Sequence, residues 1–111
     1  MRMQDCIFCK IAKQEIPKEF LYEDEDIMVF PDLTPLKPIH LLIIPKRHIP
    51  EFVAVDDTVL FSKLGRVIQT MIKRFELSNK GYRITTNGGG SQEVNHLHIH
   101  LLGPMPLKTI Q

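Results

Sequence analysis

A long amphipathic helix, predicted at residues 57–77, is the feature that most constrains the fold of this chain. Its apolar residues recur every three or four positions and form one stripe: Leu60, Leu64, Val67, Met71 and Phe75, widened by Phe61, Ile68 and Ile72. Asp56 or Asp57 precedes the stripe as a candidate N-cap, where a carboxylate also suits the helix dipole. The rest of the fold must therefore come from the segments on either side of this helix.

Short apolar runs on both sides of the helix predict strands. We expect them at residues 20–22, 27–30, 40–45, 82–87 and 94–102, with one or two turns of helix at residues 6–13. Three prolines make residues 31–38 irregular, and residues 88–93 are a glycine-rich loop. This order predicts an α+β fold with a mainly antiparallel sheet, and the length of 111 residues suits a single domain, 1–111.

Charge and hydropathy exclude several classes of function. The net charge of +1, without a basic stripe, gives no electrostatic reason to expect binding to nucleic acid or attachment to a membrane. No apolar stretch reaches the length of a membrane span, and the N-terminal residues do not resemble a signal peptide, so we expect a cytoplasmic protein. In the reducing cytosol we do not expect a structural disulfide from the two cysteines.

Three of the five histidines alternate along residues 95–100, NHLHIH. Side chains alternate between the faces of a strand, so His96, His98 and His100 would share one face and the intervening apolar residues the other. Such a row can be a solvated face, a metal site or a catalytic site. Alternate residues lie about 6.6–6.8 Å apart, so a metal would more naturally take one or two of them with ligands from elsewhere. Imidazole is also a nucleophile and a general acid–base near neutral pH.

The loop before the histidines favours the catalytic interpretation. Consecutive backbone N–H groups at residues 88–93 would form an anion-binding nest, because the glycines carry no β-carbons that block it. A flexible hairpin loop is the simpler alternative. An anion cradle beside a row of imidazoles predicts a phosphate ester or a phosphoramidate as substrate.

Cys6 and Cys9 form a C-x-x-C motif with three interpretations. They are two reduced core cysteines, a redox pair, or half of a four-ligand zinc site completed by two histidines. The redox interpretation is the weakest, because no βαβ pattern surrounds the motif.

Residues 96–102, HLHIHLL, resemble the signature of the histidine triad (HIT) family, H-φ-H-φ-H-φ-φ with φ hydrophobic. The similarity to the Hint branch of that family extends through DCIFCKIAKQEIP, LYEDEDIMVFPDLTPLKPIHLLIIPKRHI, GYRITTN and QEVNHLHIHLLG. The resemblance implies a HIT-like α+β fold with a five-stranded, mainly antiparallel sheet, one long helix and a short N-terminal helix. It also implies a homodimer that buries the long helix and a sheet edge.

The resemblance implies a purine nucleoside phosphoramidase that works through a covalent nucleotidyl-histidine. In that scheme His98 is the nucleophile, His100 contacts the phosphate oxygens, His96 frames the site and His40 orients His98. Asp32 would hold the ribose hydroxyls, as a carboxylate that only accepts hydrogen bonds. The other nucleotide-binding residues it implies are Asn87, Glu93 and Val94 beside the phosphate, and Ile7, Phe8, Phe30 and Leu33 around the base.

The same resemblance extends to the metal. Some relatives of this family bind zinc through a C-x-x-C motif, and the implied ligands here are Cys6, Cys9, His48 and His96. Each of the five histidines then has a role, and the chemistry itself needs no cofactor.

Glu93 departs from those Hint proteins that carry a serine at this position, which leaves the general acid open. The loop at residues 87–92 and the tail after Gly103 are also short, which leaves the leaving group open. Two other functions stay possible: a dinucleoside polyphosphate hydrolase of the same superfamily, and a nucleotide-binding or scaffold protein with negligible turnover.

Overall fold

The computed structural model describes residues 5–108, so the outermost residues of the predicted domain, 1–4 and 109–111, lie outside the described part. Its helices and strands follow the predicted order. They are α1 (Ile7–Ala12), β1 (Tyr22–Glu23), β2 (Ile27–Pro31), β3 (Ile39–Pro45), the 3₁₀ turn η2 (Phe52–Ala54), α2 (Thr58–Arg74), the 3₁₀ turn η3 (Leu77–Asn79), β4 (Arg83–Thr85) and β5 (Ile99–Gly103). Among these described helices, none is long and apolar enough to cross a membrane.

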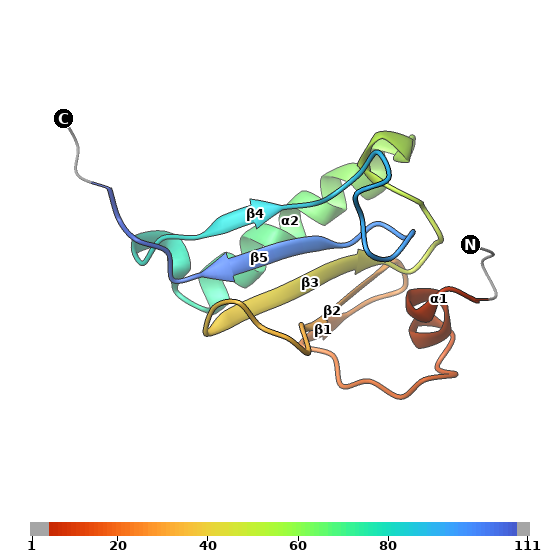
Figure 1. Ribbon diagram of the computed structural model, residues 1–111, viewed down its shortest axis with the longest axis horizontal. Coiled ribbons are helices and arrows are strands. Elements are labelled where there is room, and N and C mark those ends of the chain that lie inside the picture. The colour runs from red at the N-terminus through yellow and green to blue at the C-terminus, as the bar shows by residue number, and fades with distance from the viewer. Residues whose placement is uncertain (1–4, 109–111) are drawn as a thin grey trace.

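The five strands form one sheet in the order β1-β2-β3-β5-β4, and every neighbouring pair is antiparallel. The predicted α+β fold with a five-stranded antiparallel sheet, a long helix and a short N-terminal helix is therefore confirmed. The chain leaves the sheet after β3, forms α2, and returns through β4 at the edge before β5 fills the place beside β3 (Figure 1).

Helix α2 covers one face of the sheet (Figure 1). Asp57, one of the two predicted candidates, is its N-cap, and its carboxylate accepts hydrogen bonds from the N–H groups of Val59 and Leu60. The predicted stripe is buried against the sheet, although Phe75 is only partly buried and Phe61 is exposed. The main buried members of this core are Ile27, Val29, Leu41, Ile43, Leu60, Leu64, Val67, Ile68, Met71, Ile72, Leu97, Ile99 and Leu101.

Helix α1 covers only one end of the opposite face (Figure 1). Its buried side chains pack on the residues of β2 and β3 that point away from α2, and together they form a second core: Cys6, Phe8, Cys9, Ile11, Met28, Phe30, Leu42 and Ile44. The part of this face that belongs to β3, β5 and β4 lies beyond α1. On the face opposite α2, the sheet is therefore uncovered beyond α1, and His40, His98 and His100 lie on this uncovered part.

The predicted strand at 94–102 begins only at Ile99, because the chain before it bonds elsewhere. The N–H of Leu97 donates to the carbonyl of Ile49 at 2.6 Å, and the N–H of His96 donates to Val94 at 2.8 Å. The alternation of side chains nevertheless continues through this segment. Leu97 lies in the α2-side core, while His98 lies on the opposite face with His100.

Candidate active site and metal centre

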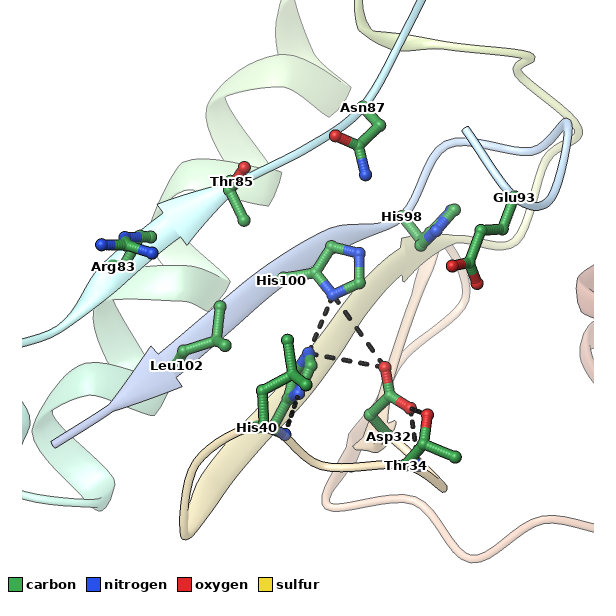
Figure 2. A pocket seen from close by; sticks show the side chains of 11 residues that line it. Asp32, Thr34, His40, Arg83, Thr85, Asn87, Glu93, His98, His100 and Leu102 are labelled. Carbon is green, nitrogen blue, oxygen red and sulfur yellow. Dashed lines mark hydrogen bonds and ion pairs between the residues drawn. The ribbon is translucent and has the colours of Figure 1, made fainter. Parts of the chain in front are cut away.

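A cavity of about 330 Å³ occupies the stretch of the sheet that α1 leaves uncovered (Figure 2). It brings together five of the predicted site residues from four separate segments: Asp32, His40, Asn87, His98 and His100. Glu93, predicted beside the phosphate, also lines it. The remaining lining residues are Thr34, Leu36, Arg83, Thr85 and Leu102.

His98 is buried, and one backbone contact determines its tautomer. Its Nδ1 lies 2.8 Å from the carbonyl oxygen of His96, and a carbonyl only accepts, so Nδ1 carries the proton. The ring of Phe8 packs against it at a centroid distance of 5.2 Å. His98 therefore presents an unprotonated Nε2 on a side chain that lines the cavity, which is the form that a nucleophile requires.

His40 contacts His100 rather than His98, which corrects the predicted pairing. The N–H of Leu36 donates to His40 Nδ1 at 3.1 Å, so the proton of the neutral ring is on Nε2. That Nε2 lies 2.9 Å from His100 Nδ1 and 3.4 Å from Asp32 Oδ2. His40 thus donates to His100, whose own proton must be on Nε2. His98 needs no side chain for its orientation, because the backbone of His96 supplies the acceptor.

The pKa of His100 is lowered, which favours its neutral form. Burial is the main cause, and the neighbouring His98 and His40 act in the same direction. The carboxylates of Asp32 and Glu93 oppose the shift. A neutral His100 with its proton on Nε2 is a hydrogen-bond donor suited to a phosphate oxygen.

Asp32 uses its two oxygens differently. Oδ1 accepts the N–H of Thr34 at 2.9 Å in a local turn, and Oδ2 faces the imidazoles of His40 and His100 at 3.4 and 4.0 Å. The turn therefore holds the carboxylate of Asp32 in the lining of the cavity, and its contact with the ribose hydroxyls stays a prediction.

The predicted glycine nest is wrong for Gly89 and Gly90. The N–H of Gly89 donates to the carboxylate of Glu51 at 3.0 Å, and the N–H of Gly90 donates to the side chain of Gln92 at 3.0 Å. A side chain of the protein already satisfies each of these two donors, so they hold the loop in place and are not free to bind an anion.

The four apolar residues predicted around the base do not line this cavity. Phe8 and Phe30 are buried in the α1-side core, whereas Ile7 and Leu33 are exposed. Val94 is partly buried against the same core. The role of these residues in base binding stays a prediction.

Sequence reasoning missed Arg83 and Thr85. The strand they form was predicted, but its pairing with β5 sets which of its side chains face the cavity, and Arg83 lies opposite Leu102 and Thr85 opposite His100. Residues directly opposite in an antiparallel pair share a face. Only the register, which is not local in the sequence, identifies them as site residues.

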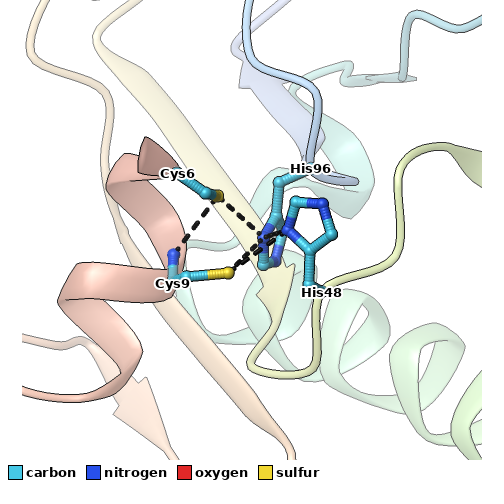
Figure 3. A group of neighbouring side chains, drawn as sticks. All are labelled: Cys6, Cys9, His48 and His96. Carbon is cyan, nitrogen blue, oxygen red and sulfur yellow. Dashed lines mark hydrogen bonds between the residues drawn. The ribbon is translucent and has the colours of Figure 1, made fainter. Parts of the chain in front are cut away.

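The predicted Cys6, Cys9, His48 and His96 come together at the end of α1, and we call them the Cys₂His₂ group (Figure 3). Their ligand atoms all lie within 4.8 Å of one another, and no disulfide joins the cysteines. His96 Nδ1 lies 3.2 Å from Cys6 Sγ and from His48 Nδ1, and 3.5 Å from Cys9 Sγ. Tetrahedral coordination by zinc separates such ligand atoms by about 3.3–3.8 Å, so only a small expansion is needed.

The surroundings of this group also fit a metal. His96 Nε2 lies 2.7 Å from the carbonyl of Pro45, which fixes its proton there and leaves the Nδ1 lone pair facing the group. Burial lowers the pKa of His96 to about 4 and raises that of Cys9 to about 11, because neither charged form is solvated. A cation would be the natural partner for these converging lone pairs.

Asp32, His40 and His100 form a second cluster of possible ligands, but it fits a metal poorly. The N–H of Leu36 occupies His40 Nδ1, so the neutral ring points a proton, not a lone pair, at the cluster centre. The 2.9 Å separation of the His40 and His100 nitrogens is that of a hydrogen bond. These three residues are better described as a hydrogen-bonded chain.

Fold and site together define an α+β protein with a histidine-lined cavity, and comparisons with known proteins agree. A family model described as "Scavenger mRNA decapping enzyme C-term binding" matches residues 5–110. The chain is 42% identical to Protein HitA of Neisseria gonorrhoeae over 91% of this chain and 97% of that protein. It is 40% identical to the purine nucleoside phosphoramidase of Escherichia coli K12, over 94% and 91% of the two chains.

Solved structures give the same result. The crystal structure of a HIT family hydrolase from Legionella pneumophila superposes with a TM-score of 0.84 at 42% identity, covering 94% of this chain and 96% of that one. A histidine triad protein from Clostridium difficile superposes with a TM-score of 0.85 at 38% identity over the whole of both chains. This chain belongs to the histidine triad family.

Proposed function

We propose that this protein is a nucleotide hydrolase that cleaves the P–N bond of purine nucleoside 5′-monophosphoramidates. The observation that carries the proposal is the geometry of His98, a buried, cavity-lining imidazole whose Nδ1 bonds to the backbone carbonyl of His96, so that the neutral ring leaves Nε2 unprotonated. The name of the Escherichia coli relative, a purine nucleoside phosphoramidase at 40% identity, supports this substrate class.

The reaction follows from the tautomers. His98 Nε2 attacks the phosphorus, the P–N bond breaks, and the leaving nitrogen takes up a proton. His100 donates its Nε2–H to a phosphate oxygen and stabilises the charge that develops there, while His40 holds His100 in this tautomer. Water then attacks the phosphorus of the nucleotidyl-His98 and releases the nucleoside monophosphate.

The nucleotide lies with its phosphate at His98 and His100 and its ribose at Asp32. Asn87, with the backbone N–H groups of Glu93 and Val94, completes the phosphate site in this proposal. Asn87 and Glu93 line the cavity, which supports their placement. The base lies toward Ile7, Phe8, Phe30 and Leu33.

We also propose that the Cys₂His₂ group binds a structural zinc ion. Two thiolates and two imidazole nitrogens are a common ligand set for a closed zinc site. The chain's own residues prepare the site, since Pro45 fixes the tautomer of His96. A bound ion would fasten α1 to the segment that leads into β5.

The proposed assembly is a cytoplasmic homodimer formed through α2 and the edge strand β4. The three residues of β4 are exposed at the edge of the sheet, with Ile84 at 47% exposure. Phe61 on α2 is 48% exposed, so both elements offer apolar surface for a partner.

Intact-mass spectrometry after mixing with an adenosine monophosphate phosphoramidate tests the function. We expect a transient mass increase of one adenylyl group that is absent in His98→Ala. Turnover that persists unchanged in His98→Ala would refute the mechanism. Turnover of a diadenosine polyphosphate is measured in parallel, because the alternative hydrolase would prefer that substrate. Nucleotide binding without turnover of either substrate would identify a binding protein.

A further inference from the structure

The proposed nucleophile, His98, lies just outside the sheet. Strand β5 begins at Ile99, and its pairing with β4 ends at Thr85 and His100. Extending that register by two residues would place Asn87 opposite His98, but Asn87 is not part of β4 and instead lines the cavity (Figure 2). Contacts other than ladder pairing with β4 must therefore hold the backbone of His98.

The hydroxyl of Thr86 supplies such a contact. It donates to the carbonyl oxygen of His98 at 2.9 Å, and Thr86 is the residue directly after the last residue of β4. This side chain is half-buried. Because the bond runs inward, toward the segment that leads into β5, it leaves the outer edge of β4 to the partner in the proposed homodimer.

Hydrogen bonds thus hold His98 through both its ring and its backbone. The ring bond, from Nδ1 to the carbonyl of His96 at 2.8 Å, determines where Nε2 lies only if the backbone at either end of it is fixed. On the N-terminal side, the N–H of Leu97 donates to the carbonyl of Ile49. On the C-terminal side, the Thr86 hydroxyl holds the carbonyl of His98 itself.

On the basis of the proposed function, we propose that Thr86 is a positioning residue, whose hydroxyl holds the backbone of His98 so that Nε2 meets the phosphorus in line. Thr86 does not touch the substrate in this proposal and takes no part in the bond changes. The rate of attack depends on the orientation of the nucleophile, so loss of the hydroxyl slows the formation of the nucleotidyl-histidine. The affinity for the nucleotide is unaffected, because Thr86 does not contribute to nucleotide binding.

Three substitutions separate the hydroxyl of Thr86 from its shape. Valine keeps the branched shape without the hydroxyl, serine keeps the hydroxyl without the methyl group, and alanine has neither. We expect the rate of adduct formation on an adenosine monophosphate phosphoramidate, followed by quenched-flow and intact-mass spectrometry, to fall about fivefold in Thr86→Val, as for one neutral hydrogen bond. Thr86→Ser should form the adduct at nearly the wild-type rate. The Kd for adenosine monophosphate, measured by calorimetry, should stay the same in both variants.

Thr86→Ser and Thr86→Ala provide the same comparison on a smaller side chain, since they differ only in the hydroxyl. The serine variant should be about fivefold faster than the alanine variant. This second pair tests the proposal even where Thr86→Val does not fold.

Tyr22→Phe is the control for a general loss of stability. It also removes one hydroxyl hydrogen bond, from Tyr22 to the carboxylate of Asp24, but it does so in β1, at the opposite edge of the sheet from β4. We expect Tyr22→Phe to lower the Tm and to leave the rate of adduct formation unchanged.

A wild-type rate in Thr86→Val would overturn the role of the hydroxyl. A lower rate in Thr86→Ser than in Thr86→Val would also overturn it, because the side chain would then act through its packing. A slower Tyr22→Phe would show that the rate only follows stability, which overturns the proposal as well. Failure of the proposed function is distinguishable, because the wild-type protein itself would then form no adenylyl adduct.

Discussion

Replacing His40 tests whether this residue acts on His100, as the contacts indicate, or on His98. His40→Phe keeps a planar ring but removes both nitrogens, so the 2.9 Å hydrogen bond to His100 Nδ1 is lost. A buried hydrogen bond between neutral groups contributes about 1 kcal/mol, which corresponds to about fivefold in rate. We expect kcat/KM on a phosphoramidate to fall by about that factor, because His100 no longer has one fixed tautomer.

A double-mutant cycle tests whether His40 acts on the reaction through His100. Kinetics of His40→Phe, His100→Ala and the double variant should show that His40→Phe has no further effect once His100 is gone, a coupling of about 1 kcal/mol. Thermal unfolding of each variant controls for loss of fold. Equal effects of His40→Phe in both backgrounds, within about 0.3–0.5 kcal/mol, would show that His40 acts independently of His100 and would refute the hydrogen-bonded chain.

Three further outcomes are expected. Elemental analysis of protein purified without an affinity tag should find about one zinc per chain, and a metal-free protein of full stability would contradict the structural site. Burial raises the pKa of Asp24, but hydrogen bonds from the Tyr22 hydroxyl, two backbone N–H groups and a lysine outweigh it and lower the pKa from 3.8 to about 2. Asp24→Asn should therefore cost about 2 kcal/mol at pH 7 in urea unfolding, a difference that disappears as the pH falls from about 4 through 2; a constant difference would contradict it. Because the Glu93 carboxylate raises the pKa of His100, Glu93→Gln should move the acidic limb of the kcat/KM profile to lower pH, and an unmoved limb would show that His100 does not set it.

Much of the fold is predictable from the sequence because its signals are local. The three- and four-residue spacing of the helix stripe and the apolar strand runs required no knowledge of partners, and α2, β2, β3 and β4 lie at the segments that these patterns predict. Strand β1 overlaps its predicted run, residues 20–22, only at Tyr22. The start of β5 was not predictable in this way. Leu97 bonds to Ile49, which is 48 residues away, and no periodicity in the histidine segment reports that contact.

In the candidate site, too, local patterns were predictable and contacts between distant residues were not. The histidine row and the C-x-x-C motif are visible as patterns, and they include His98 and His100 of the cavity and Cys6, Cys9 and His96 of the Cys₂His₂ group. Only the family resemblance named the other predicted residues, which are Asp32, His40, Asn87, Glu93 and His48. Arg83 and Thr85 were missed. The pairing of the site residues was not predictable, because it depends on which backbone group meets each ring. Leu36 determines the proton position on His40, and Glu51 fills the glycine turn that was expected to hold an anion.

His96 connects the two centres through different atoms of one residue. Its imidazole lies in the Cys₂His₂ group, while its backbone carbonyl oxygen accepts a hydrogen bond from His98 Nδ1, 2.8 Å away. Phe8 lies between the two cysteines in sequence and packs on both imidazole rings. Its ring centroid is 5.7 Å from that of His96 and 5.2 Å from that of His98. A ligand that fixes the His96 ring therefore also fixes the carbonyl that orients the proposed nucleophile. The alternation of side chains makes this possible, because His96, His98 and His100 all face away from α2. Along the chain, His96 lies in the Cys₂His₂ group, and His98 and His100 lie in the cavity.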